Sequence, residues 1–323
     1  METPPSAAPK AKRPVHITVL FGLIGGACFS AVNFALPPLA FAVAVGLISV
    51  LGAQELYRGV RRQGGEPNDI LGFIACIIFQ YAAWARGGER FVSYLPAVLI
   101  LLLLTALLAD LPKQKPKPII NVGSTLLGVV YVGWLSSYFT LMRSSSVTGL
   151  HVPGYTTTAE WLTFFVAATT WFSDAGGLFV GRALGRRKLA PEISPAKTIE
   201  GAIGGLLCAI GMGVGLGNML HLPIIHAVIL ASICAVSGLL GDLAESAFKR
   251  EVNVKDFGTV LPGHGGVLDR IDSLLFSAPL AYYYVVFVLV SQGIVSVPPA
   301  TGSISAQQIP VIQHMPDIQT GHR

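Results

Sequence analysis

The sequence has few charged residues. Asp, Glu, Lys and Arg make up only 12% of its 323 residues, whereas 52% are hydrophobic, and soluble domains carry about 25% charged residues. The mean hydropathy is +0.64. No basic soluble domain is present, so the net charge of +5 does not indicate a nucleic-acid partner.

Cysteine is also scarce. The four cysteines lie in separate apolar segments, with no C-x-x-C spacing and no neighbouring His. This pattern argues against a zinc site. We interpret all four as small buried hydrophobic residues.

Long apolar runs fill most of the chain, so we predict an all-α, polytopic integral membrane helix bundle with about nine transmembrane helices. Each run holds roughly 17–25 residues, the length of helix that crosses about 30 Å of hydrocarbon. The predicted spans are 16–35, 37–55, 69–85, 91–109, 118–141, 159–181, 199–218, 223–241 and 274–292.

The basic residues predict the orientation of this bundle, because cytoplasmic loops carry an excess of Lys and Arg. With the N-terminus inside and the C-terminus outside, only four of the 22 basic residues fall outside: Arg86, Arg90, Arg143 and Arg323. We therefore expect an N-in/C-out protein of a bacterial-type plasma (inner) membrane, with its functional face toward the cytoplasm. Anionic lipid head groups are partners of such a basic face.

Four parts follow from this pattern. We expect a disordered basic tail at 1–15, an N-terminal transmembrane bundle at 16–158, a catalytic transmembrane region with cytoplasmic loops at 159–292, and a flexible polar tail at 293–323.

One carboxylate falls within the sixth predicted span. Asp174 lies near its cytoplasmic end, and a charged side chain within the bilayer costs about 2.5–3.5 kcal/mol on the insertion scale. Such residues usually line a polar cavity. The alternative is an interfacial Asp that pairs with Arg182.

The segment "ISPAKTIEGAIGG" (193–205) follows in the next loop. We expect Ser194 to cap a helix, and Lys197 and the adjacent glycines to let a phosphate approach the helix N-terminus. The later glycines of "GMGVGLG" (211–217) indicate helix packing, and they offer a surface for a homodimer.

Two pairs of carboxylates lie in the last loop region. Asp242 and Glu245 are spaced i, i+3, and so are Asp269 and Asp272, so each pair can share one helical face. Helix capping explains one of these residues, but their convergence with Asp174 indicates a hard-metal site. Carboxylates together with substrate phosphates are ligands that Mg²⁺ prefers. Cations accompany them at Lys249, Arg250, Lys255 and Arg270.

The stretch 246–272 resembles the signature of phosphatidate cytidylyltransferases. The matching positions are Ser246-Ala-Phe-Lys249-Arg250, Lys255-Asp256, Gly258, Leu261-Pro262, His264-Gly265-Gly266 and Asp269-Arg270-Ile271-Asp272. The segments "SDAGG", "SPAKTIEGAIGG" and "GDLAES" are also similar to that family, so the resemblance covers about 170–292. The N-terminal half agrees only in being polytopic.

This resemblance implies a Mg²⁺-dependent reaction in which CTP and phosphatidate give CDP-diacylglycerol and pyrophosphate. It implies Asp242 and Asp269 as metal ligands, with Asp272 and Asp174 as further candidates. It places Lys197, Lys249, Arg250, Lys255 and Arg270 at phosphates, with Ser194, Gly265 and Gly266 in substrate binding. His264 is a candidate phosphate donor, proton carrier or structural partner.

Two other functions stay open from the residues. A phosphoglycosyl transferase would also use cytoplasmic aspartates. A transporter would use Asp174 and the Gly-rich helix as an ion site, although the chain has no evident inverted repeat.

Overall fold

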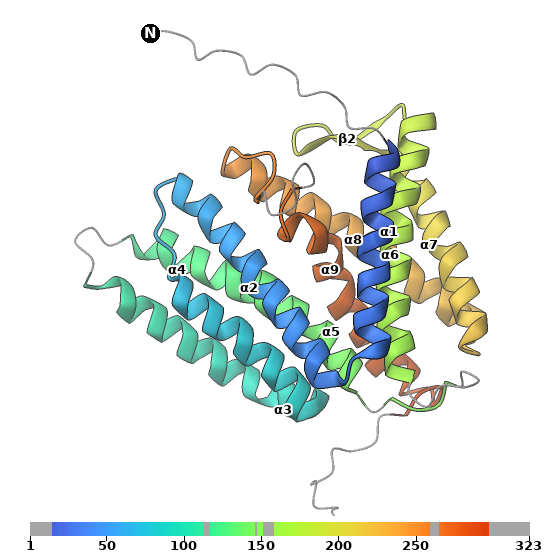
Figure 1. Cartoon of the computed structure of the whole chain (residues 1–323), viewed down its shortest axis with the longest axis horizontal. Helices are drawn as coiled ribbons and strands as arrows, with labels where there is room; N and C mark the ends of the chain where they lie inside the picture. Colours follow the sequence, from blue (N-terminus) through green and yellow to red (C-terminus); the bar gives the residue numbers. More distant parts are fainter. Residues whose placement is uncertain (1–14, 113–116, 146, 151–157, 259–264, 297–323) are drawn as a thin grey trace, which may run out of the picture.

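The computed structural model describes residues 15–112, 117–145, 147–150, 158–258 and 265–296, without the side chains of 15–21 and 86–93. The predicted tails 1–15 and 293–323 therefore lie outside it, except for Val15 and residues 293–296. The described chain is a bundle of long helices (Figure 1). Its α-helices are α1 (Val15–Ala35), α2 (Pro38–Arg62), α3 (Asp69–Asp110), α4 (Pro118–Leu127), α5 (Leu135–Ser144), α6 (Thr158–Leu184), α7 (Ile199–Met219), α8 (Ile224–Glu251) and α9 (Leu268–Tyr284).

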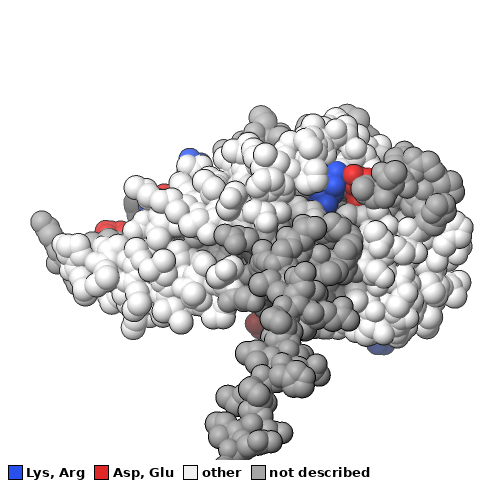
Figure 2. All heavy atoms as spheres, turned by 90° about the horizontal axis from the view of Figure 1, so that it is seen from below, with Lys and Arg blue, Asp and Glu red and all other residues white. Residues whose placement is uncertain are grey.

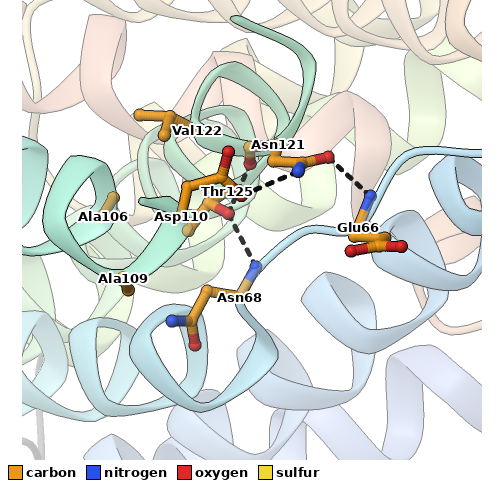
Figure 3. A pocket seen from close by; sticks show the side chains of 8 residues that line it. All are labelled: Glu66, Asn68, Ala106, Ala109, Asp110, Asn121, Val122 and Thr125. Carbon is orange, nitrogen blue, oxygen red and sulfur yellow. Dashed lines mark hydrogen bonds between the residues drawn. The ribbon is translucent and has the colours of Figure 1, made fainter. Parts of the chain in front are cut away.

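Helix α3 folds back on itself. Its 42 residues are helical throughout, yet Asn68, just before its start, and Asp110, at its end, line one small pocket together with Asn121 (Figure 3). The chain must therefore reverse direction between the apolar arms Asp69–Ala85 and Tyr94–Asp110. These arms correspond to the third and fourth predicted spans.

The described part of the chain contains two π-helices. The segment η1 (Gly128–Trp134) joins α4 to α5, and η2 (Val285–Leu289) follows α9. A π-helix within an α-helix is rare and frequently occurs at functional sites. The α4–η1–α5 unit covers the fifth predicted span.

The class prediction of an all-α membrane protein is confirmed. Five described helices are long and apolar enough to cross a membrane: Pro38–Arg62, Pro118–Ser144, Ile199–Met219, Ile224–Glu251 and Leu268–Leu289. Large apolar side chains cover the outside of the bundle, among them Leu101 (66% exposed) and Leu207 (63% exposed), and Figure 2 shows only scattered charges on one face. The number of spans and the N-in/C-out orientation stay predictions.

The cysteine prediction is half right. Cys76 and Cys234 are buried, but Cys28 and Cys208 lie on the exposed surface of the bundle. All four are free thiols. In an integral membrane protein this surface faces lipid, which is apolar like the core. The hydrophobicity of a residue therefore does not show whether it lies in the core or on the lipid-facing surface.

Strands β1 (Lys188–Ala190) and β2 (Ser194–Thr198) form an antiparallel hairpin between α6 and α7. The expectation that Ser194 caps a helix is therefore wrong. Thr198 is the cap, because its backbone is extended and its hydroxyl accepts a hydrogen bond from the Gly201 amide at 3.1 Å. Ser194 instead begins a strand that pairs with Ala190.

Glycines bring the last four helices close together. A Cβ at Gly205 in α7 would lie 2.6 Å from the backbone oxygen of Ser173 in α6, and Gly213 packs against Ala231 of α8. A Cβ at Gly211 or Gly215, by contrast, would meet no atom of another described segment within 4 Å. The packing role expected of these glycines is therefore met partly within the chain, as small residues allow close backbone approach.

Several loops meet at one end of the bundle. Arg250 at the end of α8 donates to the Ile193 carbonyl in the hairpin, and Lys117 donates to the Gly64 carbonyl after α2. Gly59 in α2 packs against Phe257 in the loop after α8. The segments that the charge pattern assigned to one side of the membrane therefore lie together.

Candidate functional site

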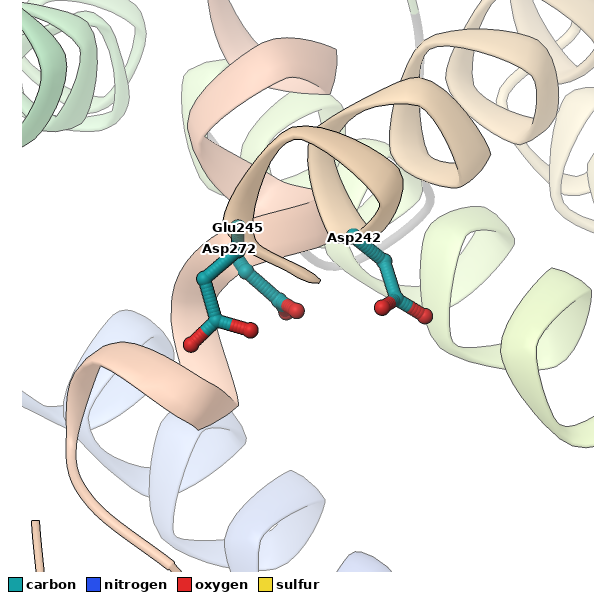
Figure 4. Close-up of side chains that lie close together, drawn as sticks. All are labelled: Asp242, Glu245 and Asp272. Carbon is teal, nitrogen blue, oxygen red and sulfur yellow. The ribbon is translucent and has the colours of Figure 1, made fainter. Parts of the chain in front are cut away.

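Three carboxylates meet at this end of the bundle. Asp242 and Glu245 project from α8 and Asp272 from α9, and one oxygen of each lies within 4.8 Å of the others (Figure 4). The i, i+3 spacing places the first two on one face of α8. Gly241 brings α9 close, because a Cβ at this position would lie 2.5 Å from the Asp272 carbonyl oxygen. We call Asp242, Glu245 and Asp272 the acid cluster.

The acid cluster extends from the interior to the surface. Glu245 is fully buried, Asp272 is 8% exposed, and the side chain of Asp242 is 34% exposed. Oε2 of Glu245 pairs with the ammonium of Lys249, and Oε1 has no hydrogen-bond partner among the described residues. The cluster therefore has one end that a ligand can reach and one end closed by protein.

Two lysines offset part of the negative charge. Lys249, one turn after Glu245, forms ion pairs with Glu245 and with Asp269, the latter at 2.7 Å from Nζ to Oδ1. Lys197 in β2 pairs with Asp242 at 2.7 Å. With Asp269 included, four carboxylates share two ammonium groups. Buried like charges repel strongly at low dielectric, so the site is suited to one more cation.

Asp269 lies beside the acid cluster and not within its group of three. It accepts hydrogen bonds from Lys249 and, at 2.6 Å, from the amide of Gly266, just before α9. Gly265 has a φ of +82°, and a Cβ there would lie 2.7 Å from Asp269 Oδ2. The two glycines thus allow the loop to close tightly over Asp269.

A cavity of about 540 Å³ adjoins the exposed end of the cluster. It lies between α6, α7, α8 and β2, and its polar lining includes Asp174, Arg182, Ser194, Lys197 and Asp242. Binding sites for small ligands typically have volumes of about 300–1,000 Å³. The structure therefore brings Asp174, Ser194 and Lys197 to the same cavity as Asp242.

The remaining predicted site residues are exposed or lie outside the described residues. Arg250 is exposed and donates to the Ile193 carbonyl at 3.1 Å. Lys255 and Arg270 are exposed, in the loop after α8 and in the first turn of α9. His264 lies outside the described residues.

Sequence reasoning missed Glu55. This residue of α2 is only 1% exposed, and its Oε2 accepts a hydrogen bond from the Leu268 amide at 2.9 Å. Gly258 and Gly266 pack against the same carboxylate so closely that neither position has room for a Cβ. A lone carboxylate at the end of an apolar run was the available signal. Glu245 was recognised by its spacing but was not counted as a metal ligand.

Comparison with known proteins gives a consistent result. Residues 16–288 match the cytidylyltransferase family. The phosphatidate cytidylyltransferase of Bacillus subtilis is 35% identical over 247 residues, which cover 73% of this chain and 86% of the relative. That of Synechocystis is 33% identical over 269 residues, or 77% and 89% of the two chains. That of Haemophilus influenzae is 45% identical over 134 residues, or 40% and 46%. The similarity thus extends well beyond 170–292 and includes the N-terminal half.

Proposed function

The chain belongs to the cytidylyltransferase family, and on that premise we propose that it is a phosphatidate cytidylyltransferase. It transfers CMP from CTP to phosphatidate and yields CDP-diacylglycerol and pyrophosphate, a step of phospholipid biosynthesis. The observation that carries this proposal is the acid cluster, which lies with Lys197 beside a ligand-sized cavity at the end of an apolar helix bundle.

The reaction needs charge neutralisation more than a strong base. A phosphate monoester has a second pKa of about 6, so the lipid phosphate is already largely ionised near neutral pH. Its oxygen forms a bond to the α-phosphorus of CTP, and the bond from that phosphorus to the β-phosphate oxygen breaks. Two anions must approach each other for this to happen. Positioning and electrostatic stabilisation therefore account for most of the catalysis.

The donor set of the site fits Mg²⁺. Its oxygens are carboxylates within 4.8 Å of one another, and Mg²⁺ binds through one or two carboxylates plus substrate phosphates. Asp242 and Asp272 would hold the ion, with Glu245 at the closed end and Asp269 and Asp174 nearby. When bound, the ion neutralises negative charge on the phosphates of CTP and polarises them.

The cations act on the phosphates from the sides of the cavity. Lys197 and Ser194 line it directly, and Arg250, Lys255 and Arg270 supply positive charge from the surrounding loops. The amides of Gly265 and Gly266 belong to the loop that ends at α9, and His264 is a candidate phosphate donor, proton carrier or structural partner. Lys249, held by Glu245 and Asp269, keeps the two acidic helices in register next to the phosphates.

The site faces the cytoplasm at the inner leaflet of the plasma membrane. The supporting observation is that the basic loops meet at one end of the bundle, as the positive-inside rule requires for a cytoplasmic end. Phosphatidate enters from the leaflet and CTP from solution. The protein works as a homodimer, for which the uncovered glycines Gly211 and Gly215 of α7 provide close packing.

The decisive experiment measures pyrophosphate release by the purified protein in detergent. Release should require CTP, phosphatidate and a divalent ion together. A labelled UDP-sugar offered in place of CTP should give no lipid product. Pyrophosphate release that does not depend on phosphatidate, or transfer from the UDP-sugar, would contradict the proposal.

A further inference from the structure

Tyr131 places a buried hydroxyl beside the acid cluster. This residue lies in the middle of η1, and only 5% of its surface is exposed. Its hydroxyl has no hydrogen-bond partner among the described residues. A buried polar atom without a partner is unusual in a folded protein and requires an explanation.

The ring of Tyr131 packs between the two helices that carry the acid cluster. It makes edge-to-face contacts with Phe248 of α8, at 5.3 Å between centroids, and with Phe276 of α9, at 6.2 Å. Phe248 lies one turn after Glu245, and Phe276 lies one turn after Asp272. The Tyr131 ring therefore packs next to the helical turns that carry Glu245 and Asp272.

The π-helix holds this side chain firmly in place. At its start, Gly128 packs against the ring of Tyr57, with no room for a Cβ. Near its other end, a Cβ at Gly133 would lie 2.9 Å from the Cys76 sulfur. The segment that presents Tyr131 is therefore fixed against α2 and α3 on both sides, which is the rigid support that a binding group needs.

The Tyr131 side chain thus lies next to the two helices that carry the acid cluster. Tyr131 offers a donor that has no partner among the described residues, whereas Glu245 is already paired with Lys249. Because the Tyr131 hydroxyl is buried without a partner in the described part of the chain, it can still donate to a group bound beside the acid cluster. An oxygen ligand of a divalent cation meets both conditions: it can accept a hydrogen bond from a hydroxyl, and it lies beside the carboxylates that bind the cation.

We propose that the Tyr131 hydroxyl donates a hydrogen bond to an oxygen ligand of the cation bound by the acid cluster, either a water molecule or a phosphate oxygen of CTP. This inference rests on the function proposed above and adds to it a residue from the N-terminal half. Groups that hydrogen-bond to the ligands of a metal fix their orientation, and losing one typically costs about 10- to 100-fold in metal affinity or activity.

The test compares Tyr131→Phe with Tyr138→Phe. Tyr138 is a matched control, because it is buried in the same α4–η1–α5 unit but bonds to the Tyr283 hydroxyl at 2.7 Å. Mn²⁺ binding is measured by electron paramagnetic resonance, first alone and then with CTP, alongside turnover and thermal stability. We expect Tyr131→Phe to reduce kcat/KM about 10- to 100-fold without lowering Tm, whereas Tyr138→Phe lowers Tm and leaves kcat/KM near wild type.

The two sources of the oxygen ligand are distinguished by the binding arms. Weaker Mn²⁺ binding without CTP identifies water as the acceptor, and weaker binding only in the presence of CTP identifies a phosphate oxygen. Unchanged Mn²⁺ binding and turnover in Tyr131→Phe would overturn the inference, and so would a Tm loss equal to that of Tyr138→Phe with no specific change in Mn²⁺ binding. Failure of the wild-type protein to release pyrophosphate would instead contradict the proposed function.

Discussion

The carboxylate of Glu55 accepts a hydrogen bond from the Leu268 amide at 2.9 Å, across 213 positions of the chain. Glu55 belongs to α2, and Leu268 begins α9, the helix that carries Asp269 and Asp272. Buried carboxylates at helix N-termini satisfy free amides and favour the positive end of the helix dipole. The N-terminal half of the protein therefore holds the first turn of the acidic helix in position.

Replacement of Glu55 should weaken the contact between α2 and the start of α9. In Glu55→Ala the Leu268 amide loses its acceptor, and an unsatisfied buried group costs about 1–3 kcal/mol of unfolding free energy. We expect a lower Tm in detergent and a reduced rate of pyrophosphate release. Glu55→Gln keeps an oxygen acceptor and should be affected less. The exposed Glu192 provides the control Glu192→Ala, and wild-type behaviour of Glu55→Ala would contradict this role.

Loss of one acidic side chain near the proposed ion should stop turnover without unfolding the protein. We expect Asp242→Asn and Asp269→Asn to fall below about a tenth of the wild-type rate at millimolar Mg²⁺, since metal-site residues govern affinity and activity by about 10- to 100-fold or more. Circular dichroism should show an unchanged helix content. Glu251→Gln, at the exposed end of α8, is the matched control. A higher residual rate in either Asn variant would contradict the role of that residue at the ion site.

Lys249 should contribute to stability through the buried Glu245. Its removal in Lys249→Met leaves the Glu245 carboxylate uncompensated, and breaking a buried ion pair in this way costs about 3–5 kcal/mol. The double variant Lys249→Met/Glu245→Gln should recover part of the lost stability, because the buried charge of Glu245 is then removed together with its partner. Denaturant unfolding in detergent measures the coupling between the two residues. Strictly additive effects would show that the two side chains do not interact.

Substitution of His264 tests whether the reaction needs a general base. General bases contribute about 10²- to 10⁴-fold to rates, whereas the lipid phosphate is largely ionised without one. We therefore expect His264→Gln to keep measurable activity and to lose less of the wild-type rate than the aspartate variants do. The steady-state rate across pH 6–9 is the measurement. Complete loss of turnover in a folded His264→Gln protein would contradict the electrostatic account.

Local patterns in the sequence predicted the helices and several of the site residues. Each predicted span coincides with a helical segment, including the two arms of α3, because hydropathy and length are properties of a short stretch. The same holds for Asp242 and Glu245, whose spacing alone places them on one face of α8. The motif similarity located the acidic helix α9. The family match over residues 16–288 shows that the similarity extends through the N-terminal half.

Other features depended on contacts between distant segments. The Glu55–Leu268 bond, the packing of Tyr131 between Phe248 and Phe276 and the approach of Asp272 at Gly241 have no local signal. They arise when helices pack, because close packing fixes which faces meet and which polar groups lose water. The sequence by itself determined the apolar helices and which acidic residues share a helical face. Only the tertiary structure decided that Glu245 joins Asp242 and Asp272 while Asp269 pairs with Lys249, since that choice depends on how α8 and α9 pack.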